Sequence, residues 1–554
     1  MARSVAPATS LSTSVRVGHT AHLDTFCRDH LPPPELWPDM DWSFYPQLAT
    51  RHQLNCAAEL LDDCVKSGDG ERAVFRCGRG DWTYRRLLES SNRLANVLQH
   101  DLGLLPGNRV LLRGPNSPML AACWFAVLKL GGVAVCTMPM LRARELRQII
   151  NKAEVNLCLT EASLAAECDD AIEDLHRCRV VSFSPDGSGE LESMAARKSD
   201  AFATYQTLAT DVAIIAFTSG TTGEAKGTMH FHRDLMVVAD CFPACALRPD
   251  PDDVFTGSPS VAFTYGLGGL LLFPMRYHAS AVLLDRSSPS SLLEGIQKFR
   301  ASICFTSPTA YRAMLRELGQ YNIASLRKCV SAAETLPATT FEAWRQKTGL
   351  NIIDGIGSTE LLHIFISAPE DQIRPGSTGK VLKGYEACVL DENGQEVPPG
   401  VIGRLAVRGP TGCRYLDDIE NQRRYVRNGW NITGDAFRRD ENGYFWYQSR
   451  LDDLIISSGY NISGAEIENV LLDHPKVNEC AVVGVLDTAR GSVVKAFVVL
   501  QDGVVPNDSV VKELQEFVKS QIAPYKYPRA IKFMKALPRT PTGKLQRFKL
   551  REES

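Results

Sequence analysis

Residues 218–227 form a stretch whose residue types could bind phosphate. They read Thr-Ser-Gly-Thr-Thr-Gly-Glu-Ala-Lys-Gly and follow an apolar run at 212–217 that is typical of a buried strand. Glycine lets the backbone approach a ligand closely, and exposed N–H groups, hydroxyls and the Lys226 ammonium suit phosphate oxygens. A Walker P-loop requires a Gly-Lys pair, whereas Ala225 precedes Lys226 here. The stretch therefore predicts a nucleotide-phosphate site of a different architecture.

Four further stretches carry chemistry-bearing side chains, although each alone also fits a capped turn or solvated surface. Residues 354–360 read Asp-Gly-Ile-Gly-Ser-Thr-Glu, and Glu360 is a hard oxygen ligand of the kind that Mg²⁺ takes beside phosphates. Asp435 follows Gly434, where a carboxylate could hold ribose hydroxyls or cap a turn. The other two stretches are 450–460 and 538–544, the latter ending in Lys544 after Pro541 and Gly543.

The composition is that of an ordinary globular protein. The 554 residues are 44% hydrophobic and 23% charged, and the formal net charge of −3 argues against a dedicated nucleic-acid binder. The sixteen cysteines are scattered, with no Cys-x-x-Cys pair or zinc-like Cys/His spacing, which favours reduced thiols in an intracellular protein. The best membrane-span candidate, 121–138, contains Lys129 and two glycines, and is more typical of a core helix, a turn and a strand.

The N-terminal segment bears on location. Before Asp24, the first acidic residue, it holds Arg3, Arg16 and several serines. This composition favours a disordered leader over a mitochondrial presequence. We therefore expect a cytoplasmic protein, with the mitochondrial matrix as the alternative. We also expect a monomer or homodimer that binds no nucleic acid and no membrane.

The elements that position these stretches alternate along the chain. Strands alternate with helices from about residue 54 to 331, which predicts βαβ units and largely parallel sheets. A helix is expected at 230–239, directly after the phosphate stretch. Between 379 and 447, Asn-Gly turns separate short strands of a small β subdomain. A separate α+β pattern occupies the last hundred or so residues.

The predicted fold class is therefore α/β. A large N-terminal domain with two βαβ-type sheets and a small β subdomain is hinged to a small α+β C-terminal domain. The expected boundaries are 1–50 for a leader and N-terminal extension, 51–449 for the large domain, 450–452 for the hinge and 453–554 for the C-terminal domain.

Together and in this order, the five stretches resemble those of the acyl-adenylate-forming superfamily, which includes acyl-CoA synthetases, nonribosomal peptide adenylation domains and firefly luciferases. The resemblance runs from about residue 55 to 550. Within it, the chain is similar to benzoate-CoA and 2-aminobenzoate-CoA ligases at 20–26, 31–34, 54–57, 229–234, 262–268 and 354–365. The resemblance implies an AMP-forming acid–thiol ligase that uses ATP, Mg²⁺ and CoA.

The resemblance also implies a role for each motif residue. Lys544 would bridge the substrate carboxylate and the α-phosphate, Thr359 would contact that phosphate, and Glu360 would bind Mg²⁺. Asp435 and Arg450 would hold the ribose. The other expected ATP contacts are Thr218, Ser219, Gly220, Thr221, Thr222, Gly223, Lys226, Ala332, Ala333, Glu334, Asp354, Gly355 and Ser358. The expected hinge residue is Asp452, and the expected CoA contacts are Ser458, Gly459 and Tyr460.

Three positions depart from the superfamily pattern. Ala225 stands where proline often precedes the loop lysine, and Ile356 replaces an aromatic residue beside the adenine. Phe263 stands where histidine is frequent, at the gate between the acyl pocket and the CoA tunnel. The benzoate-type branch shares Ile356, so we still expect an active enzyme.

The acyl pocket decides the expected substrate. By position, its lining is Ala262, Phe263, Tyr265, Gly357, His363 and Ile364. Tyr265 and Ile364 predict a short, flat, apolar slot for one aromatic ring. His363 either hydrogen-bonds a ring nitrogen or an ortho substituent, or packs against backbone.

The sequence thus predicts an aryl-acid:CoA ligase for benzoate, 2-aminobenzoate, salicylate or nicotinate. A free-standing adenylation enzyme that loads a carrier-protein thiol and a medium-chain fatty acyl-CoA synthetase are the alternatives. A non-catalytic nucleotide-binding protein is a third, and the intact Lys544, Glu360 and Asp435 argue against it.

Overall fold

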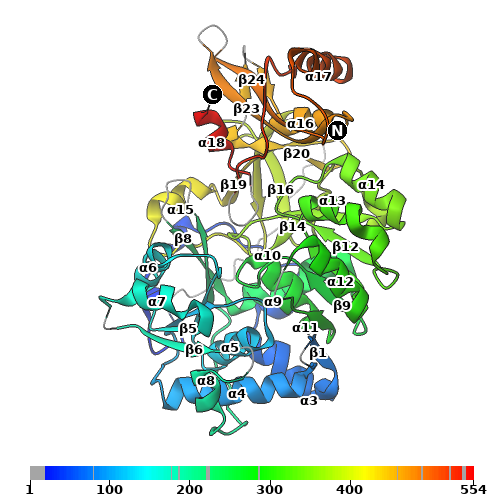
Figure 1. Cartoon of the computed structure of the whole chain (residues 1–554). Coiled ribbons are helices and arrows are strands. Elements are labelled where there is room, and N and C mark those ends of the chain that lie inside the picture. Colours follow the sequence, from blue (N-terminus) through cyan, green and yellow to red (C-terminus); the bar gives the residue numbers. More distant parts are fainter. Residues whose placement is uncertain are drawn as a thin grey trace, which may run out of the picture.

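The computed structural model describes residues 19–78, 80–175, 177–184, 187–219, 225–284, 287–453, 455–457, 460–487, 491–522, 526–539 and 545–553. At positions 219, 452, 456, 457, 460, 461, 487 and 491 it describes the backbone alone. Figure 1 shows a larger body, below, and a smaller C-terminal part, above, which begins after strand β20 (Phe445–Arg450). This two-part α/β arrangement agrees with the predicted fold class.

The first sheet of the larger body has six strands in the order β6-β5-β3-β4-β7-β8. All neighbours are parallel except β7 and β8. Residues of β3 alternate between two cores, since Val110 and Leu112 belong to the core that includes α4 and α5, and Leu111 to the core that includes α6 and α7. Helices therefore cover both faces. The bounds are β3 (Arg109–Arg113), β4 (Val133–Thr137), β5 (Leu157–Glu161), β6 (Arg179–Phe183), β7 (Val212–Ser219), β8 (Ala225–Phe231), α4 (Tyr84–His100), α5 (Pro118–Lys129), α6 (Ala143–Lys152), η4 (Ala162–Leu164), α7 (Ala165–Ile172) and α8 (Glu190–Ala195).

The second sheet has nine strands in the order β15-β14-β13-β12-β11-β9-β10-β1-β2. The strands from β13 to β1 are parallel, and β14, β15 and β2 add antiparallel edges. The strand bounds are β1 (Ala73–Arg76), β2 (Trp82–Thr83), β9 (Val254–Gly257), β10 (Ser280–Val282), β11 (Ile303–Thr306), β12 (Lys328–Ser331), β13 (Ile352–Gly357), β14 (Ile364–Ser367) and β15 (Lys380–Val381).

Helices cover this second sheet and the segments beside it. Buried residues of α12, α13 and α14 share one core with β11 and β12, and those of α9 and the π-helix η6 share another. The bounds are η2 (Ala58–Asp62), α3 (Asp63–Lys66), η3 (Asp69–Glu71), α9 (His232–Phe242), η5 (Pro243–Leu247), α10 (Thr264–Leu267), η6 (Gly268–Leu272), α11 (Phe273–Arg276), α12 (Pro289–Phe299), α13 (Pro308–Glu317), η7 (Leu318–Gln320), α14 (Ala338–Thr348) and η8 (Glu370–Gln372).

The phosphate stretch belongs to a β-hairpin, which corrects one prediction. A helix was expected from residue 230, but His230 lies in β8 and α9 begins at His232. The cause is tertiary pairing: β8 pairs with β7 along its length, and on its other side the Met229 amide donates to the Arg414 carbonyl at 2.8 Å. These strand contacts override the local helical pattern.

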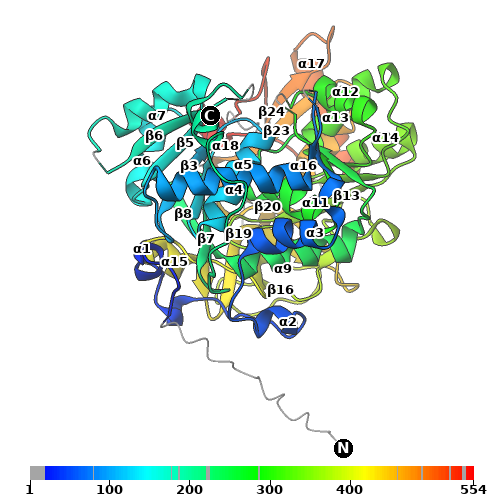
Figure 2. The ribbon, with the colours of Figure 1, turned by 90° about the horizontal axis from the view of Figure 1, so that it is seen from below.

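The segment at 19–50 packs onto the larger body (Figure 2). Thr20 Oγ1 donates to Asp211 Oδ1 at 2.5 Å, the Asp24 carboxylate forms an ion pair with Arg109, and Met40 bridges to Gly409. These contacts tie the segment to the first sheet and to the β subdomain. Its elements are α1 (Phe26–Asp29), η1 (Pro34–Leu36) and α2 (Pro46–Ala49).

A five-stranded antiparallel sheet forms the β subdomain, with β16-β17-β19-β18 in order and β20 paired to β19. The three predicted Asn-Gly turns are present, and Gly394, Gly429 and Gly443 all have positive φ, from 76° to 80°. The predicted start at 379 is too early, because β15 joins the nine-stranded sheet. The bounds are β16 (Glu386–Leu390), β17 (Ile402–Arg408), α15 (Ile419–Tyr425), β18 (Val426–Arg427) and β19 (Trp430–Arg439).

The C-terminal part contains a three-stranded sheet in the order β23-β24-β25, with α16 and α17 sharing its apolar core. The predicted α+β pattern is therefore present. The bounds are η9 (Leu451–Asp453), β21 (Ile455–Ser457), β22 (Tyr460–Ile462), α16 (Gly464–Leu472), β23 (Val477–Asp487), β24 (Gly491–Leu500), α17 (Asp508–Gln521), β25 (Ala530–Phe533) and α18 (Arg547–Glu552). Among the described residues, every helix is too short or too polar to cross a membrane.

Candidate active site

The hairpin β7–β8 carries the phosphate stretch. Thr218 pairs with Lys226 across the hairpin, and Lys226 Nζ donates to Asn421 Oδ1 on α15 at 2.9 Å. Asn421 is held in turn, because its Nδ2 donates to Asp418 Oδ2 at 2.8 Å. Lys226 thus lies at a defined place beside α15. Of the predicted phosphate contacts, Gly220, Thr221, Thr222 and Gly223 lie outside the described residues, and Ser219 is described by its backbone alone.

The turn after β13 is held by groups from other elements. Tyr415 Oη donates to Glu360 Oε1 at 2.7 Å, and burial together with the Glu360 charge raises the pKa of Tyr415. Tyr415 therefore stays protonated and remains a donor to Glu360. Ser358 Oγ and Tyr425 Oη lie 3.2 Å apart.

His230 is hydrogen-bonded to the same turn. Its Nε2–H donates to the Thr359 carbonyl oxygen at 2.8 Å, and burial lowers the pKa of His230 to about 4, which keeps the ring neutral. Sequence reasoning identified Ser358, Thr359 and Glu360 but assigned no role to Tyr415, Tyr425 or His230. No spacing in the sequence identifies these three residues, because they come close to the turn only in the folded chain.

The structure brings Asp435 and Arg450 together, as expected for a shared ligand. They are register partners on β19 and β20, and Arg450 Nη1 donates to Asp435 Oδ1 at 2.9 Å and to the Thr433 carbonyl at 3.2 Å. Gly434 has φ of 78°, and a Cβ there would lie 2.9 Å from Arg450 Nη2. Burial raises the pKa of Asp435, and the Arg450 guanidinium opposes this shift.

The residues expected around the adenine differ in whether their side chains are already hydrogen-bonded. Asp354 Oδ1 is buried and has no hydrogen-bond partner among the described atoms, and burial raises the pKa of this carboxyl. Its neighbour Gly355 is buried, Ala332 is buried on the adjoining segment, and Ala333 is exposed with φ of 73°. Glu334, by contrast, is already engaged, because its Oε2 accepts from Thr309 Oγ1 at 2.7 Å.

Glu334 also faces the C-terminal part. Its Oε1 lies 3.8 Å from Arg539 Nη1, and Arg539 bridges to Leu545 through the backbone. These two residues flank 540–544, so the described ends of the segment that carries the predicted catalytic lysine lie near Glu334, one of the expected ATP contacts. Lys544 itself lies outside the described residues.

The expected acyl-pocket residues His363 and Tyr265 lie among packed aromatic rings. His363 is 3% exposed, and its ring centroid lies 4.6 Å from that of Phe273 and 5.9 Å from that of Tyr265. Burial lowers the pKa of His363 to about 3, and neither ring nitrogen has a hydrogen-bond partner among the described atoms. Tyr265 Oη donates to the Thr306 and Val330 carbonyls, each at 3.3 Å. The site therefore contains a neutral, unpaired imidazole in an aromatic wall.

Glycines make room for that wall. A Cβ at Gly268 would lie 2.4 Å from His363 Nε2, and one at Gly357 would lie 2.6 Å from the His363 carbonyl oxygen. Gly268 and Phe273 were missed by sequence reasoning, although a glycine pair inside an apolar run signals close backbone approach. The remaining expected residues, Ala262, Phe263 and Ile364, lie before α10 and at the start of β14.

The expected CoA and hinge residues are described less fully. Asp452 lies in η9 and Tyr460 begins β22, both with backbone alone, and Ser458 and Gly459 lie outside the described residues. Their roles therefore stay predictions.

Two family models match most of the chain. A family described as AMP-binding enzyme matches residues 62–414, and its C-terminal domain matches residues 466–544. The chain belongs to the AMP-binding enzyme family. This confirms the family predicted from the five stretches. Glu360, a carboxylate oriented by Tyr415 beside the expected phosphates, fits the oxygen ligands that Mg²⁺ prefers.

Three relatives of this AMP-binding enzyme are similar along most of their length. Benzoate–CoA ligase from Thauera aromatica is 32% identical over 91% of this chain and 97% of the ligase. Acyl-coenzyme A synthetase ACSM3, mitochondrial, from Pongo abelii is 34% identical over 85% of this chain and 83% of the synthetase. The crystal structure of the anthranilate CoA ligase AuaEII with anthranoyl-AMP superimposes with a TM-score of 0.87 at 32% identity, covering 91% of this chain and 98% of that one.

Proposed function

We propose that this AMP-binding enzyme is an ATP-dependent ligase that joins a small aryl carboxylate to CoA. One observation supports the proposal: the segment at 354–364 connects an expected nucleotide contact, Glu360, to an expected acyl-pocket residue, His363. Glu360 contacts Tyr415 on the nucleotide side, and His363 packs between Phe273 and Tyr265 on the acyl side. A ring bound in this slot presents its carboxylate toward Thr359 and the α-phosphate. Similarity to a benzoate–CoA ligase and an anthranilate CoA ligase supports this reading.

In the first half-reaction, a carboxylate oxygen of the acid attacks the α-phosphorus of ATP, and pyrophosphate leaves. Because two anions approach each other, a cation at that point stabilises the transition state, and Lys544 supplies it from the C-terminal part. Asp435 and Arg450 orient the ribose, and Lys226 holds the outer phosphates. Mg²⁺ held by Glu360 would neutralise phosphate charge.

In the second half-reaction, the CoA thiolate attacks the carbonyl carbon of the acyl-AMP. The bond from that carbon to the phosphate oxygen breaks, and AMP leaves with its electron pair, giving aryl-CoA. Because the two half-reactions need different groups, the C-terminal part turns about Asp452 and brings residues 458–460 to the pantetheine path. This motion requires that the large domain ends at residue 449 and that the C-terminal domain begins at residue 453, as we propose.

The slot also favours aryl acids over fatty acids. Tyr265, Phe273 and His363 form a wall of rings, with Phe242 also 5.8 Å from the His363 ring. Such a wall of rings suits one aromatic ring better than a flexible chain. The ring substituent, the oligomeric state and the location in cytoplasm or mitochondrial matrix stay predictions.

An ATP–pyrophosphate exchange screen tests the proposal. Purified enzyme is assayed with benzoate, 2-aminobenzoate, salicylate, nicotinate and octanoate, and again with CoA to detect the thioester. We expect exchange with at least one aryl acid far above that with octanoate, and an aryl-CoA product. Faster exchange with octanoate than with every aryl acid contradicts the substrate class, and exchange without thioester contradicts the CoA ligase.

A further inference from the structure

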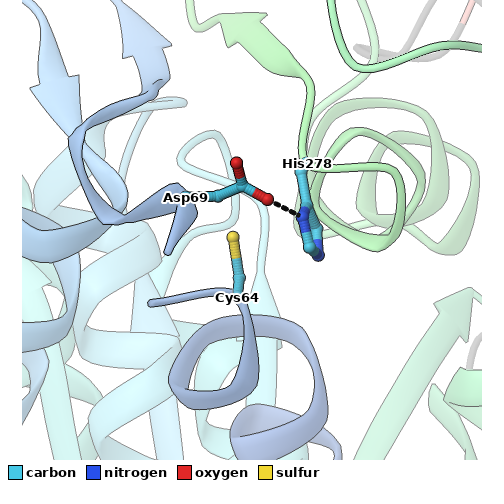
Figure 3. A group of neighbouring side chains, drawn as sticks. All are labelled: Cys64, Asp69 and His278. Carbon is cyan, nitrogen blue, oxygen red and sulfur yellow. Dashed lines mark hydrogen bonds and ion pairs between the residues drawn. The ribbon is translucent and has the colours of Figure 1, made fainter. Parts of the chain in front are cut away.

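Three metal-ligating side chains meet at a place that the proposed reaction does not use. Cys64, Asp69 and His278 each offer one ligand atom, and these three atoms lie within 4.8 Å of one another (Figure 3). Cys64 belongs to α3, Asp69 begins η3, and His278 lies between α11 and β10. Figure 1 shows α3 at the end of the larger body away from α15 and the C-terminal part. Helix α11 begins with Phe273 of the aromatic wall, but none of the three ligands is a residue of the expected site. The cluster is therefore separate from the candidate active site.

The three ligand atoms approach from different sides. Cys64 is 1% exposed and forms the floor, whereas the side chains of Asp69 and His278 are 39% and 32% exposed. His278 Nδ1 donates to Asp69 Oδ2 at 2.6 Å. A buried sulfur below two partly exposed ligands leaves a path from solvent, which a metal site requires.

Bonds to groups outside the cluster hold these residues. Arg72 Nε donates to the His278 carbonyl at 3.1 Å, and the His278 amide donates to the Met275 carbonyl at 3.2 Å. Ser67 Oγ donates to the Cys64 carbonyl at 2.8 Å. The Arg72 guanidinium is directed to Asp252 Oδ1 at 3.0 Å. The backbones of His278 and Cys64 are thus held by hydrogen bonds that do not depend on an ion.

The chemistry of the three ligands selects the ion. Mg²⁺ and Ca²⁺ take oxygen ligands, whereas Zn²⁺ is bound by thiolate, imidazole and carboxylate together. A thiolate and a carboxylate carry two negative charges, which a divalent ion balances. We propose that Cys64, Asp69 and His278 bind one Zn²⁺, with water as the fourth ligand.

Binding changes the protons and the spacing in a defined way. The Cys64 thiol proton goes to solvent, and the imidazole exchanges its Nδ1 proton for one on Nε2 when Nδ1 becomes the ligand. Ligand atoms in a tetrahedral zinc site lie roughly 3.4 Å apart, given Zn–N and Zn–O bonds of about 2.1 Å. The ion therefore replaces the Asp69–His278 hydrogen bond and separates the two side chains slightly. It clamps two segments that are 209 residues apart in sequence.

Cobalt binding tests the site with a readout independent of ligase activity. Full-length protein is freed of metal with a chelator, kept reduced, and titrated with Co²⁺ and then Zn²⁺ in excess Mg²⁺. We expect one equivalent to bind, a near-ultraviolet sulfur-to-cobalt band, displacement of that band by Zn²⁺, and a Tm rise of about 3 °C. No sulfur-to-cobalt band at one equivalent overturns the proposal.

Variants separate this site from adventitious binding to the other cysteines. Cys64→Ser should abolish the sulfur band, and Asp69→Asn and His278→Asn should weaken binding at least about 10-fold while keeping the fold. Asn suits His278 because the native φ of 54° is left-handed. Cys77→Ser and His100→Asn are matched controls and should leave binding unchanged. Equal loss in the controls, or a retained band in Cys64→Ser, contradicts the site without affecting the proposed ligase.

Discussion

The proposed nucleotide side of the candidate site, around Glu360 and Asp435, and the proposed acyl side, around His363, hold their polar groups differently. On the nucleotide side, Glu360 accepts from Tyr415 at 2.7 Å and Asp435 accepts from Arg450 at 2.9 Å. On the acyl side, His363 contacts aromatic rings, and its two nitrogens bond no described atom. Glu360 and Asp435 are thus paired across elements, although Asp354 Oδ1 nearby in sequence has no partner among the described atoms, whereas both nitrogens of the buried His363 imidazole are unpaired.

The difference teaches which property each side controls. Paired charges are held in place before substrate arrives, and such preorganised groups act on the transition state whatever acid is bound. An unpaired polar atom in an apolar wall instead discriminates between ligands that can and cannot bond to it. Nucleotide-side changes should therefore slow all acids alike, and acyl-side changes should alter their ranking.

The largest uniform effect is expected from Lys544→Ala. Loss of a well-placed cation should lower the rate of acyl-AMP formation roughly 10²–10³-fold for every acid. Thioester formation from supplied acyl-AMP and CoA should be retained, because the lysine serves the first half-reaction. Single-turnover assays of each half-reaction measure both rates, and equal loss in the two would contradict the two-step scheme.

Gly268→Ala should act on the acyl side alone. The new Cβ would lie 2.4 Å from His363 Nε2, and overpacking of this kind costs about 1–3 kcal/mol. We expect kcat/KM for the preferred aryl acid to fall about 10–100-fold while the KM for ATP stays unchanged. Gly319→Ala is the control, since no atom lies within 4 Å of its added Cβ. A matching rise in the KM for ATP would show that the two sides are coupled.

Tyr415→Phe and Tyr425→Phe compare two hydrogen bonds within the nucleotide side. The first removes a donor to the Glu360 carboxylate and the second a bond between neutral hydroxyls. Because bonds to charged groups are the stronger, we expect about a 10-fold loss of kcat/KM for Tyr415→Phe and a smaller one for Tyr425→Phe. The Mg²⁺ concentration for half-maximal rate should rise only for Tyr415→Phe. The reverse order would refute the role of Tyr415 in orienting Glu360.

The smallest effect concerns two of the buried histidines, His230 and His363. Burial lowers the pKa of His230 to about 4 and that of His363 to about 3 in the folded state. Between these values and 6.5 the unfolded state binds more protons, so stability falls as pH falls through that window.

Each ring should contribute a slope of about 1 kcal/mol per pH unit to the unfolding free energy. Urea unfolding between pH 7 and 5 measures the slope of the unfolding free energy against pH. We expect His230→Gln and His363→Gln to flatten this slope. His100→Gln, at an exposed position, is the control and should keep the wild-type slope. Unchanged slopes in both buried variants would mean that these rings are not buried as neutral groups.

Much of the architecture follows from local sequence. The glycines at 394, 429 and 443 predicted turns because positive φ favours glycine, and the turns are present. The predicted alternation of strands and helices between about residue 54 and 331 is present, as in β3, α5 and β4. Two boundaries show the limit: pairing of β8 with β7 places His230 in a strand and not in α9, and pairing of β15 with β14 places residues 380–381 in the nine-stranded sheet and not in the β subdomain.

The sequence by itself determined the family, the order of the five stretches and the glycine turns that hold them, since these depend on residues close in the chain. The tertiary structure decided which distant groups meet. Tyr415 reaches Glu360 across 55 positions, and His278 reaches Asp69 across 209. Such contacts depend on strand order and helix packing, which no local spacing encodes. For that reason the sequence showed no zinc-like spacing, and the folded chain brings a sulfur, a carboxylate and an imidazole together.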